Sequence, residues 1–256
     1  MSVRRMLALL SLTVVIGFSM GSTAEAGKIV LANDEWTLGD FAGAFSAPND
    51  AGTFATNVAS WFTGGGAGDF HAYSSNFGLN GTNLANAMTG AGHTWTTGTG
   101  ITFDLATLLT YNAIFLAGDD ADNAVLISYV EAGGNVYLAG GTGVGGSAAE
   151  AGRWNTFLNH FGLGFGAVYN GVGGSIAISS SHPIFAGVDH LFQDNGSDTL
   201  DINVSDPRAT ILVSQNGHGL YAVFDSGATA VPEPASLLLL GSGLVGLSAW
   251  RRMKKI

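Results

Sequence analysis

The stretch Tyr111–Gly143, which reads YNAIFLAGDDADNAVLISYVEAGGNVYLAGGTG, decides the fold class. It opens with one apolar run, Asn112–Ala117, and closes on a second, Val136–Ala139. Between them, apolar residues recur at helical spacing over residues 125–130, and a glycine pair follows. Two buried strands joined by a helix form the crossover unit of parallel sheets. The stretch therefore predicts an α/β domain.

The same alternation extends on both sides of this unit. Lys28–Asn33 and Phe70–Tyr73 are expected strands, and apolar spacing predicts helices over residues 54–62 and, after a Thr82 cap, 84–88. The clearest helical face, followed by Gly162 as an expected C-cap, consists of Trp154, Phe157, Leu158 and Phe161. Alternation to about residue 170 predicts a three-layer, flavodoxin-like domain with a mostly parallel sheet.

The last third of the body has a different pattern. Ser175–Ser179, Thr210–Ser214 and Gly219–Phe224 are expected strands, and no long helix is predicted between them. Antiparallel strands need only short connections. We therefore expect these segments to add antiparallel edge strands to the sheet.

Residues 1–26 have the three parts of a secretory signal peptide. Two basic residues, Arg4 and Arg5, precede the apolar run Met6–Phe18, and small residues lead to Ala24-Glu25-Ala26. A basic start, a short apolar core and an Ala-x-Ala exit are typical of chains that the secretion machinery exports and cleaves. We expect cleavage after Ala26.

The other end, residues 229–256, carries three elements in a fixed order. Pro232-Glu233-Pro234 precedes an apolar run over residues 235–250, a predicted transmembrane helix, and a basic cluster begins with Arg251 and Arg252. This arrangement resembles the PEP-CTERM sorting signal. The resemblance implies that an exosortase-type membrane protease recognises and cleaves the chain, so that it is anchored only transiently before it reaches the cell surface or the medium. A permanent tail anchor is the alternative.

The body between these ends, residues 27–228, is strongly acidic. The whole chain has a formal net charge of −10, although most of its basic residues lie in the two terminal segments. Between residues 27 and 230 the basic residues are Lys28, Arg153 and Arg208. An acidic surface repels phosphate backbones, so no nucleic-acid partner is expected.

The absence of cysteine bears on a second resemblance. Tyr111–Gly143 resembles class I glutamine-amidotransferase-like and trehalose-utilisation-like domains, and His182–Leu191 (HPIFAGVDHL) is similar to the latter. In amidotransferases the turn after the second strand of this unit carries the catalytic cysteine, but here that turn is Gly140–Gly143. The resemblance implies the fold without that chemistry. A hydrolase would need Thr142, or a nearby serine, as nucleophile and a histidine as base.

Candidate site residues cluster after three predicted strands. Asn33, Asp34, Glu35 and Trp36 follow the first strand, Asp119 and Asp120 follow the third, and Gly141 and Thr142 follow the fourth. In a flavodoxin-like strand order, the first and third strands meet where the order reverses, which is where ligands bind. Oxygen ligands and a tryptophan suit a divalent cation or a neutral sugar. Asp34, Glu35, Asp119 and Asp120 are the candidate calcium ligands. Without a cation, charge repulsion should raise at least one carboxyl pKa.

These observations favour one function and leave two others open. Export, the sorting signal and the missing cysteine favour a non-catalytic binding or structural module of the cell surface or extracellular matrix, with extracellular polysaccharide as a candidate partner. The first alternative is an envelope hydrolase that uses a non-cysteine site on the amidotransferase-like fold. The second is a structural module stabilised by a metal ion such as calcium.

Overall fold

The computed structural model describes residues 27–40 and 43–229. The predicted signal peptide, sorting signal and transmembrane segment lie outside these residues. Within the described ranges, no helix is both long enough and apolar enough to cross a membrane.

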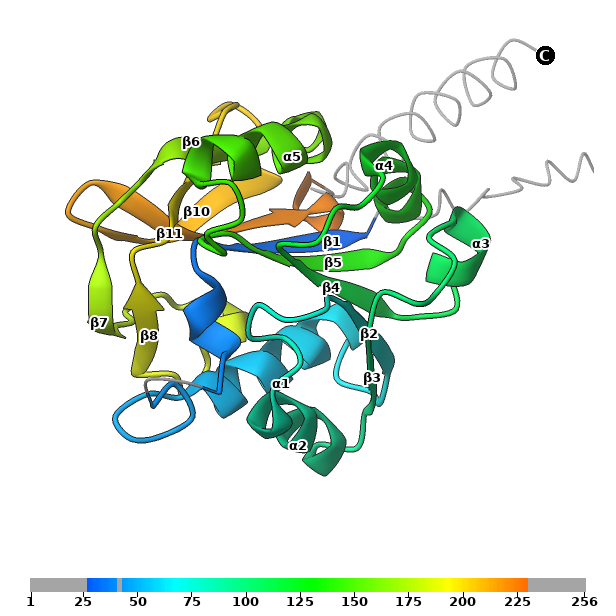
Figure 1. The fold of residues 1–256 in the computed structure, drawn as a ribbon, viewed down its shortest axis with the longest axis horizontal. Coiled ribbons are helices and arrows are strands. Elements are labelled where there is room, and N and C mark those ends of the chain that lie inside the picture. Colours follow the sequence, from blue (N-terminus) through cyan, green and yellow to red (C-terminus); the bar gives the residue numbers. More distant parts are fainter. Residues whose placement is uncertain (1–26, 41–42, 230–256) are drawn as a thin grey trace, which may run out of the picture.

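A seven-stranded sheet forms the centre of the molecule (Figure 1). Its strands are β1 (Lys28–Ala32), β2 (Asp69–Tyr73), β3 (Thr94–Thr97), β4 (Ala113–Ala117), β5 (Asn135–Ala139), β10 (Ala209–Gln215) and β11 (His218–Asp225). They lie in the order β10-β11-β1-β5-β4-β2-β3, and β1 to β5 are mutually parallel. Strands β10 and β11 extend the sheet antiparallel to β1. The α/β class, the mostly parallel sheet and the antiparallel edge strands expected at Thr210–Ser214 and Gly219–Phe224 are confirmed. The strand expected at Ser175–Ser179 pairs in a separate two-stranded sheet and does not join the main one.

The strand order itself differs from that of flavodoxin. Strand β1 pairs with β5, in the register Ile29↔Val136, and therefore not with β4. The connection after β1 runs to one face of the sheet and the connection after β5 runs to the other. The switch points, at which neighbouring strands send their connections to opposite faces of the sheet, therefore lie between β1 and β5 and between β2 and β4. Pairing depends on contacts distant in sequence, which the hydrophobic pattern of single strands does not encode.

Helices cover both faces of the sheet, which gives the three predicted layers (Figure 1). One face carries α1 (Ala51–Thr63) and α2 (Thr82–Gly90), and the other carries α3 (Leu105–Leu108), α4 (Asn123–Glu131) and α5 (Ser147–His160). Alternate side chains of each strand enter the two cores: Val30 packs with α1, whereas Ile29 packs with α5.

The predicted apolar face of α5 is confirmed. Trp154, Phe157 and Leu158 are fully buried, and Phe161 is 5% exposed. The ring of Phe161 lies 5.0 Å from that of Phe224, centroid to centroid, so the helix packs on β11. Phe161 is the C-cap of this helix, and Gly162 follows it at φ +76°.

The predicted cap of α2 is wrong in its details. Thr82 is the first helical residue, and the N-cap position belongs to Gly81, which has no side chain to offer. The carboxylate of Asp40 supplies the missing acceptors, because it binds the backbone N–H groups of Thr82 at 2.6 Å and Asn83 at 3.0 Å. A distant residue has replaced the local cap.

Two small antiparallel sheets lie beside the end of the main sheet at which the parallel strands β1 to β5 have their C-terminal residues, here called the carboxyl edge. They pair β6 (Leu163–Tyr169) with β9 (Ser197–Asp201), and β7 (Gly173–Ala177) with β8 (His190–Asp194). The segment between β8 and β9 packs on the end of β1, where the Ser197 N–H donates to the Asn33 carbonyl at 2.9 Å. These strands therefore cover part of the predicted site.

The two ends of the body lie next to each other. Lys28 of β1 pairs with Asp225 of β11, at the edge of the sheet opposite the carboxyl ends of β1 to β5 (Figure 1). The segments that lead to the signal peptide and to the sorting signal therefore join the body at one edge. The loops after the parallel strands lie at the other.

Candidate functional site

Two adjacent acids follow β1 at the carboxyl edge. Asp34 is fully buried, and its Oδ1 accepts a hydrogen bond from the Trp36 N–H at 2.9 Å. Its Oδ2 accepts from the N–H of Asp194 at the end of β8. Asp34 thus caps the short 3₁₀ helix η1 (Glu35–Leu38) and fastens the β8 segment to the main sheet.

Burial changes the ionisation of both acids. It raises the pKa of Asp34 to about 7, against the two backbone hydrogen bonds that lower it. The pKa of Glu35 rises to about 8, first because of burial and then because of the charges of Asp34 and Glu150. The direction agrees with the prediction, but desolvation is the larger cause and charge repulsion the smaller one. Within the described structure, Oε2 of Glu35 is buried without a hydrogen-bond partner.

Glu150 is a third acid of this group, and it was not predicted from the sequence. It lies in the first turn of α5, is fully buried, and binds the turn after β5. Its carboxylate accepts from the Gly141 N–H at 2.8 Å and from the Thr142 hydroxyl at 2.5 Å. The signal for it is an acid at the start of the helix that follows the glycine-rich turn. The hydroxyl of Thr142 is therefore paired with a carboxylate, and not with the histidine that a hydrolase would use as its base.

The Gly140–Gly143 turn approaches β1 closely. Gly141 has φ +67°, and a Cβ there would lie 2.9 Å from the Gly196 Cα and 3.0 Å from the Asn33 carbonyl oxygen. Only glycine fits at such a position. Asn33 is itself fully buried, and both polar atoms of its side chain lack a hydrogen-bond partner among the described residues. The structure thus brings Asn33, Asp34, Gly141 and Thr142 together at one end of the sheet.

The other two predicted acids have different partners. Asp119 accepts hydrogen bonds from the Ser75 N–H at 2.6 Å and from the Ser75 hydroxyl at 2.9 Å. Asp120 pairs with the Arg153 Nε at 2.5 Å. Both follow β4, and β5 separates β4 from β1. In residues 27–40 and 43–229, no group of three or more His, Cys, Asp or Glu could hold a metal ion. The calcium site stays a prediction.

A polar pocket of about 190 Å³ opens at the carboxyl edge. It is lined by Asp40, Asn76, Gly78, Asn80 and Gly81. These residues come from the segment after η1 and from the loop between β2 and α2. The pocket was not predicted from the sequence, although the Asn- and Gly-rich loop NFGLNG was an available signal for it.

Neighbouring loops hold the pocket in shape. Asp119 fixes Ser75 at one end of the β2–α2 loop, and Asp40 fixes the start of α2 at the other. Phe77 has φ +54°, an uncommon backbone conformation for a bulky residue, and this cost is typical of functional loops. A Cβ on Gly78 would lie 2.8 Å from the Glu35 carbonyl oxygen, so the pocket adjoins the buried acids.

Trp36 belongs to η1 and directly follows the two acids Asp34 and Glu35. It is partly buried, and its ring centroid lies 6.3 Å from that of Phe192 in a tilted arrangement. The predicted tryptophan is thus near the carboxyl edge, with part of its surface packed against β8.

One histidine has the hydroxyl contact that a hydrolase would need. The Nδ1 of His71 lies 2.7 Å from the Thr96 hydroxyl, and its Nε2 lies 2.8 Å from the Gly98 carbonyl. Since a carbonyl only accepts, Nε2 carries the proton and Nδ1 accepts from Thr96. Burial lowers the pKa of His71. The pair joins β2 to β3, and the lining of the polar pocket includes neither residue.

Comparison with known protein families identifies a motif in the C-terminal segment. Residues 230–252 match the model of the PEP-CTERM protein-sorting motif, which confirms the resemblance of the C-terminal segment. No curated protein and no solved structure matches the chain. The likeness of Tyr111–Gly143 to amidotransferase-like domains stays a prediction. The motif supports export and sorting by an exosortase, a membrane protease.

Proposed function

We propose that this exported exosortase substrate carries a non-catalytic binding module, and that its ligand is a neutral, hydroxyl-rich chain such as an extracellular polysaccharide. The observation that supports the proposal is the polar pocket formed by Asp40, Asn76, Gly78, Asn80 and Gly81 at the carboxyl edge. It lies in the region of an α/β sheet where ligands bind.

The chemistry of the lining suits sugar hydroxyls. Each asparagine amide offers two donor hydrogens and an acceptor oxygen, and a hydroxyl can both donate and accept. The two glycines let a ligand approach the backbone closely. At about 190 Å³, the pocket is smaller than the ~300–1,000 Å³ of drug-sized sites, so it would take one residue of a longer chain.

The charge of the body supports a neutral ligand over an anionic one. The pocket includes the Asp40 carboxylate, and the ionisable side chains of the adjoining segment, Asp34 and Glu35, are acids that can add negative charge but no positive charge. No basic side chain lines the pocket among the described residues. A phosphate or uronic acid would therefore meet repulsion without compensation.

Binding of neutral polysaccharides to the mature exported protein tests this proposal. Replacing Asn76 and Asn80 together with Ala should weaken binding at least about tenfold, because two bidentate amides are lost. Asn86→Ala, on the exposed side of α2 and outside the pocket lining, is the matched control. Unchanged calorimetric affinity in the double variant, or the absence of binding to every neutral glycan tried, would overturn the proposal.

An envelope hydrolase is the second candidate, and the ionisation of Asp34 and Glu35 favours it. Carboxyl groups with pKa values of about 7 and about 8 can exchange protons near neutral pH. Glu35 is partly exposed and adjoins Gly78 of the pocket. Release of reducing ends from a bound glycan, abolished by Glu35→Gln with binding retained, would establish the hydrolase instead.

A further inference from the structure

The sequence contains three Asn-x-Ser/Thr triplets, which begin at Asn80, Asn195 and Asn203. This triplet is the acceptor sequence for N-linked glycans, and it is read in exported proteins at exposed positions. The three sites differ in how far the structure leaves them accessible.

The Asn195 triplet is not accessible to a transferase in the folded protein. Gly196 and Ser197 are both buried, with Ser197 fully so, against the end of β1. The Asn195 side chain is also engaged, because its Oδ1 accepts from the Gly171 N–H at 2.8 Å. A transferase cannot reach the hydroxyl that completes this triplet without separating β9 from the main sheet.

The Asn80 triplet is exposed but held in a fixed conformation. Asn80 lines the polar pocket, and Thr82 is the first residue of α2 with its N–H bound to Asp40. An acceptor segment has to fit the transferase as an extended or looped chain, and a helix start fastened at this point resists that.

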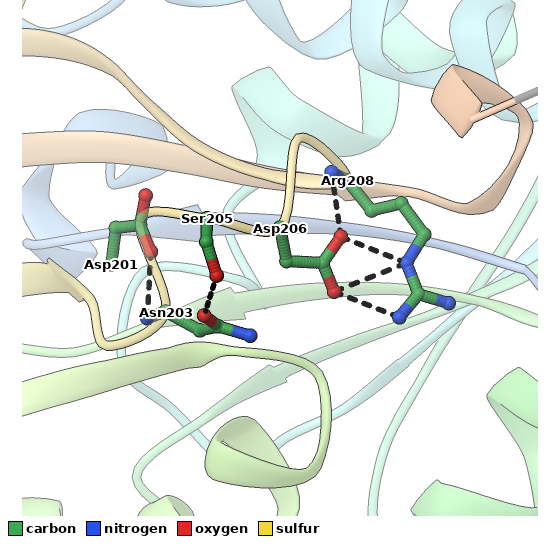
Figure 2. Close-up of polar contacts among 5 residues, drawn as sticks. All are labelled: Asp201, Asn203, Ser205, Asp206 and Arg208. Carbon is green, nitrogen blue, oxygen red and sulfur yellow. Dashed lines mark hydrogen bonds and ion pairs between the residues drawn. The ribbon is translucent and has the colours of Figure 1, made fainter.

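The Asn203 triplet lies in the loop between β9 and β10 (Figure 2). All three of its residues are exposed. Val204 at its centre is 88% exposed, and the preceding Ile202 is 50% exposed. At the far end of this loop Asp206 pairs with Arg208 at 2.8 Å, and the Arg208 carbonyl accepts from the Asp225 N–H of β11 at 2.8 Å, which fastens this end to the main sheet. The triplet therefore projects from a fixed base.

The local geometry presents the amide nitrogen of Asn203. The Ser205 hydroxyl donates to the Asn203 Oδ1 at 2.7 Å, and Asp201 Oδ1 accepts from the Asn203 backbone N–H at 2.9 Å. Figure 2 shows Nδ2 on the side of the amide that faces away from Ser205. Among the three triplets, only the one at Asn203 has a carboxylate two residues before its asparagine, namely Asp201. The corresponding residues of the other two triplets are Gly78 and Gln193.

We propose that Asn203 is an N-glycosylation site of the exported protein. The donor is a lipid-linked oligosaccharide pyrophosphate and the catalyst an oligosaccharyltransferase. Nδ2 of Asn203 forms a bond to the anomeric carbon of the first sugar, and the bond from that carbon to the pyrophosphate oxygen breaks. The lipid pyrophosphate leaves with the electron pair, and one amide proton passes to a base.

Mass spectrometry of the full protein from its native host tests the site. Intact mass and peptide mapping should find a carbohydrate mass on the peptide that contains Asn203. The mass should disappear in Asn203→Gln and in Ser205→Ala, which keeps the asparagine, and it should remain in Ser205→Thr, which keeps the triplet.

Asn80→Gln is the matched control, because it removes an exposed triplet of the same type and should leave the carbohydrate mass unchanged. An unmodified Asn203 in the wild-type protein, or a carbohydrate mass that persists in both Asn203→Gln and Ser205→Ala, would overturn the proposal. Thermal melting of each variant confirms that the loss of the glycan does not reflect misfolding.

Discussion

At the end of β1, Asp34 and Glu35 are kept in surroundings that favour their protonated forms. Asp34 uses both oxygens to hold neighbouring segments, whereas Glu35 leaves one buried oxygen without a partner among the described residues. Burying an acid in this way costs free energy, and that cost depends on pH through the difference in pKa between the folded and unfolded states.

Glu35→Gln should make folding stability less dependent on pH. Because the folded pKa is about 8 and the ordinary value is 4.5, the folded state keeps a proton that the unfolded state releases between these pH values. Stability conferred by Glu35 is therefore full below pH 4.5, falls as pH rises and is lost above about 8. The slope is at most ~1.4 kcal/mol per pH unit for one proton, and solvent screening of the partly exposed side chain reduces it.

Denaturant unfolding of the wild type and Glu35→Gln between pH 4 and pH 9 checks this expectation. Asp69→Asn, which replaces an exposed acid at the start of β2, is the control and should leave the pH profile unchanged. A Glu35→Gln profile as steep as that of the wild type would show that Glu35 titrates normally in the folded protein.

The site could be predicted from the sequence only in part. Asn33, Asp34, Gly141 and Thr142 were found because polar and glycine residues directly follow buried strands. Glu150 was missed because its role depends on α5 turning back towards β5, which the local pattern does not show. Placing Asp119 and Asp120 beside Asp34 required a strand order that the structure does not have.

At the scale of single elements, α5 should contribute much of the stability of its core. Phe157 is fully buried, and its ring lies 5.5 Å from that of Phe161, centroid to centroid. Phe157→Ala removes a large apolar side chain and leaves a cavity, so the free energy of unfolding should fall by ~3–5 kcal/mol. Urea unfolding curves measure the loss.

Val168→Ala serves as the control for that measurement. Val168 lies on β6 and is 74% exposed, so its truncation should change the free energy of unfolding by less than ~0.5 kcal/mol. A loss below ~1 kcal/mol for Phe157→Ala would contradict the packing of α5 on the sheet.

Strongly periodic elements were predictable and weakly patterned ones were not. Strands β1, β4 and β5 are continuous apolar runs buried on both faces, which is a direct signal. Strand β3 is mostly exposed and reads TWTT, and β9 reads SDTLD, so neither has a run of apolar residues. Their pairing comes from neighbouring strands and not from their own composition.

At the scale of the whole molecule, the sorting motif at residues 230–252 should decide where the protein is found. In a host that lacks the sorting protease, the chain should stay in the membrane fraction through residues 235–250. In the native host, mass spectrometry should find that the mature protein begins at Gly27 and lacks Ile256. Halving the basic cluster by Arg251→Ala with Arg252→Ala should impair this processing, whereas Arg208→Ala, in the body, should not.

Detection of Ile256 on the mature surface protein of the native host would instead establish a permanent tail anchor. A mature N-terminus that begins before Ala24 would contradict the predicted signal-peptide cleavage. The two results are independent, because one concerns the anchor and the other concerns export.

The pairing of Lys28 with Asp225 also determines how the body responds to mechanical force. A tether attached after β11 and a ligand held at the carboxyl edge would pull on opposite ends of the same sheet, along the direction of its strands. Strand β11 is hydrogen-bonded on one side to β1 and on the other to β10. Because these bonds run perpendicular to the strands, such a load shears the two ladders at once instead of opening them one bond at a time. The topology therefore resists a load that is applied along the strands between these two ends.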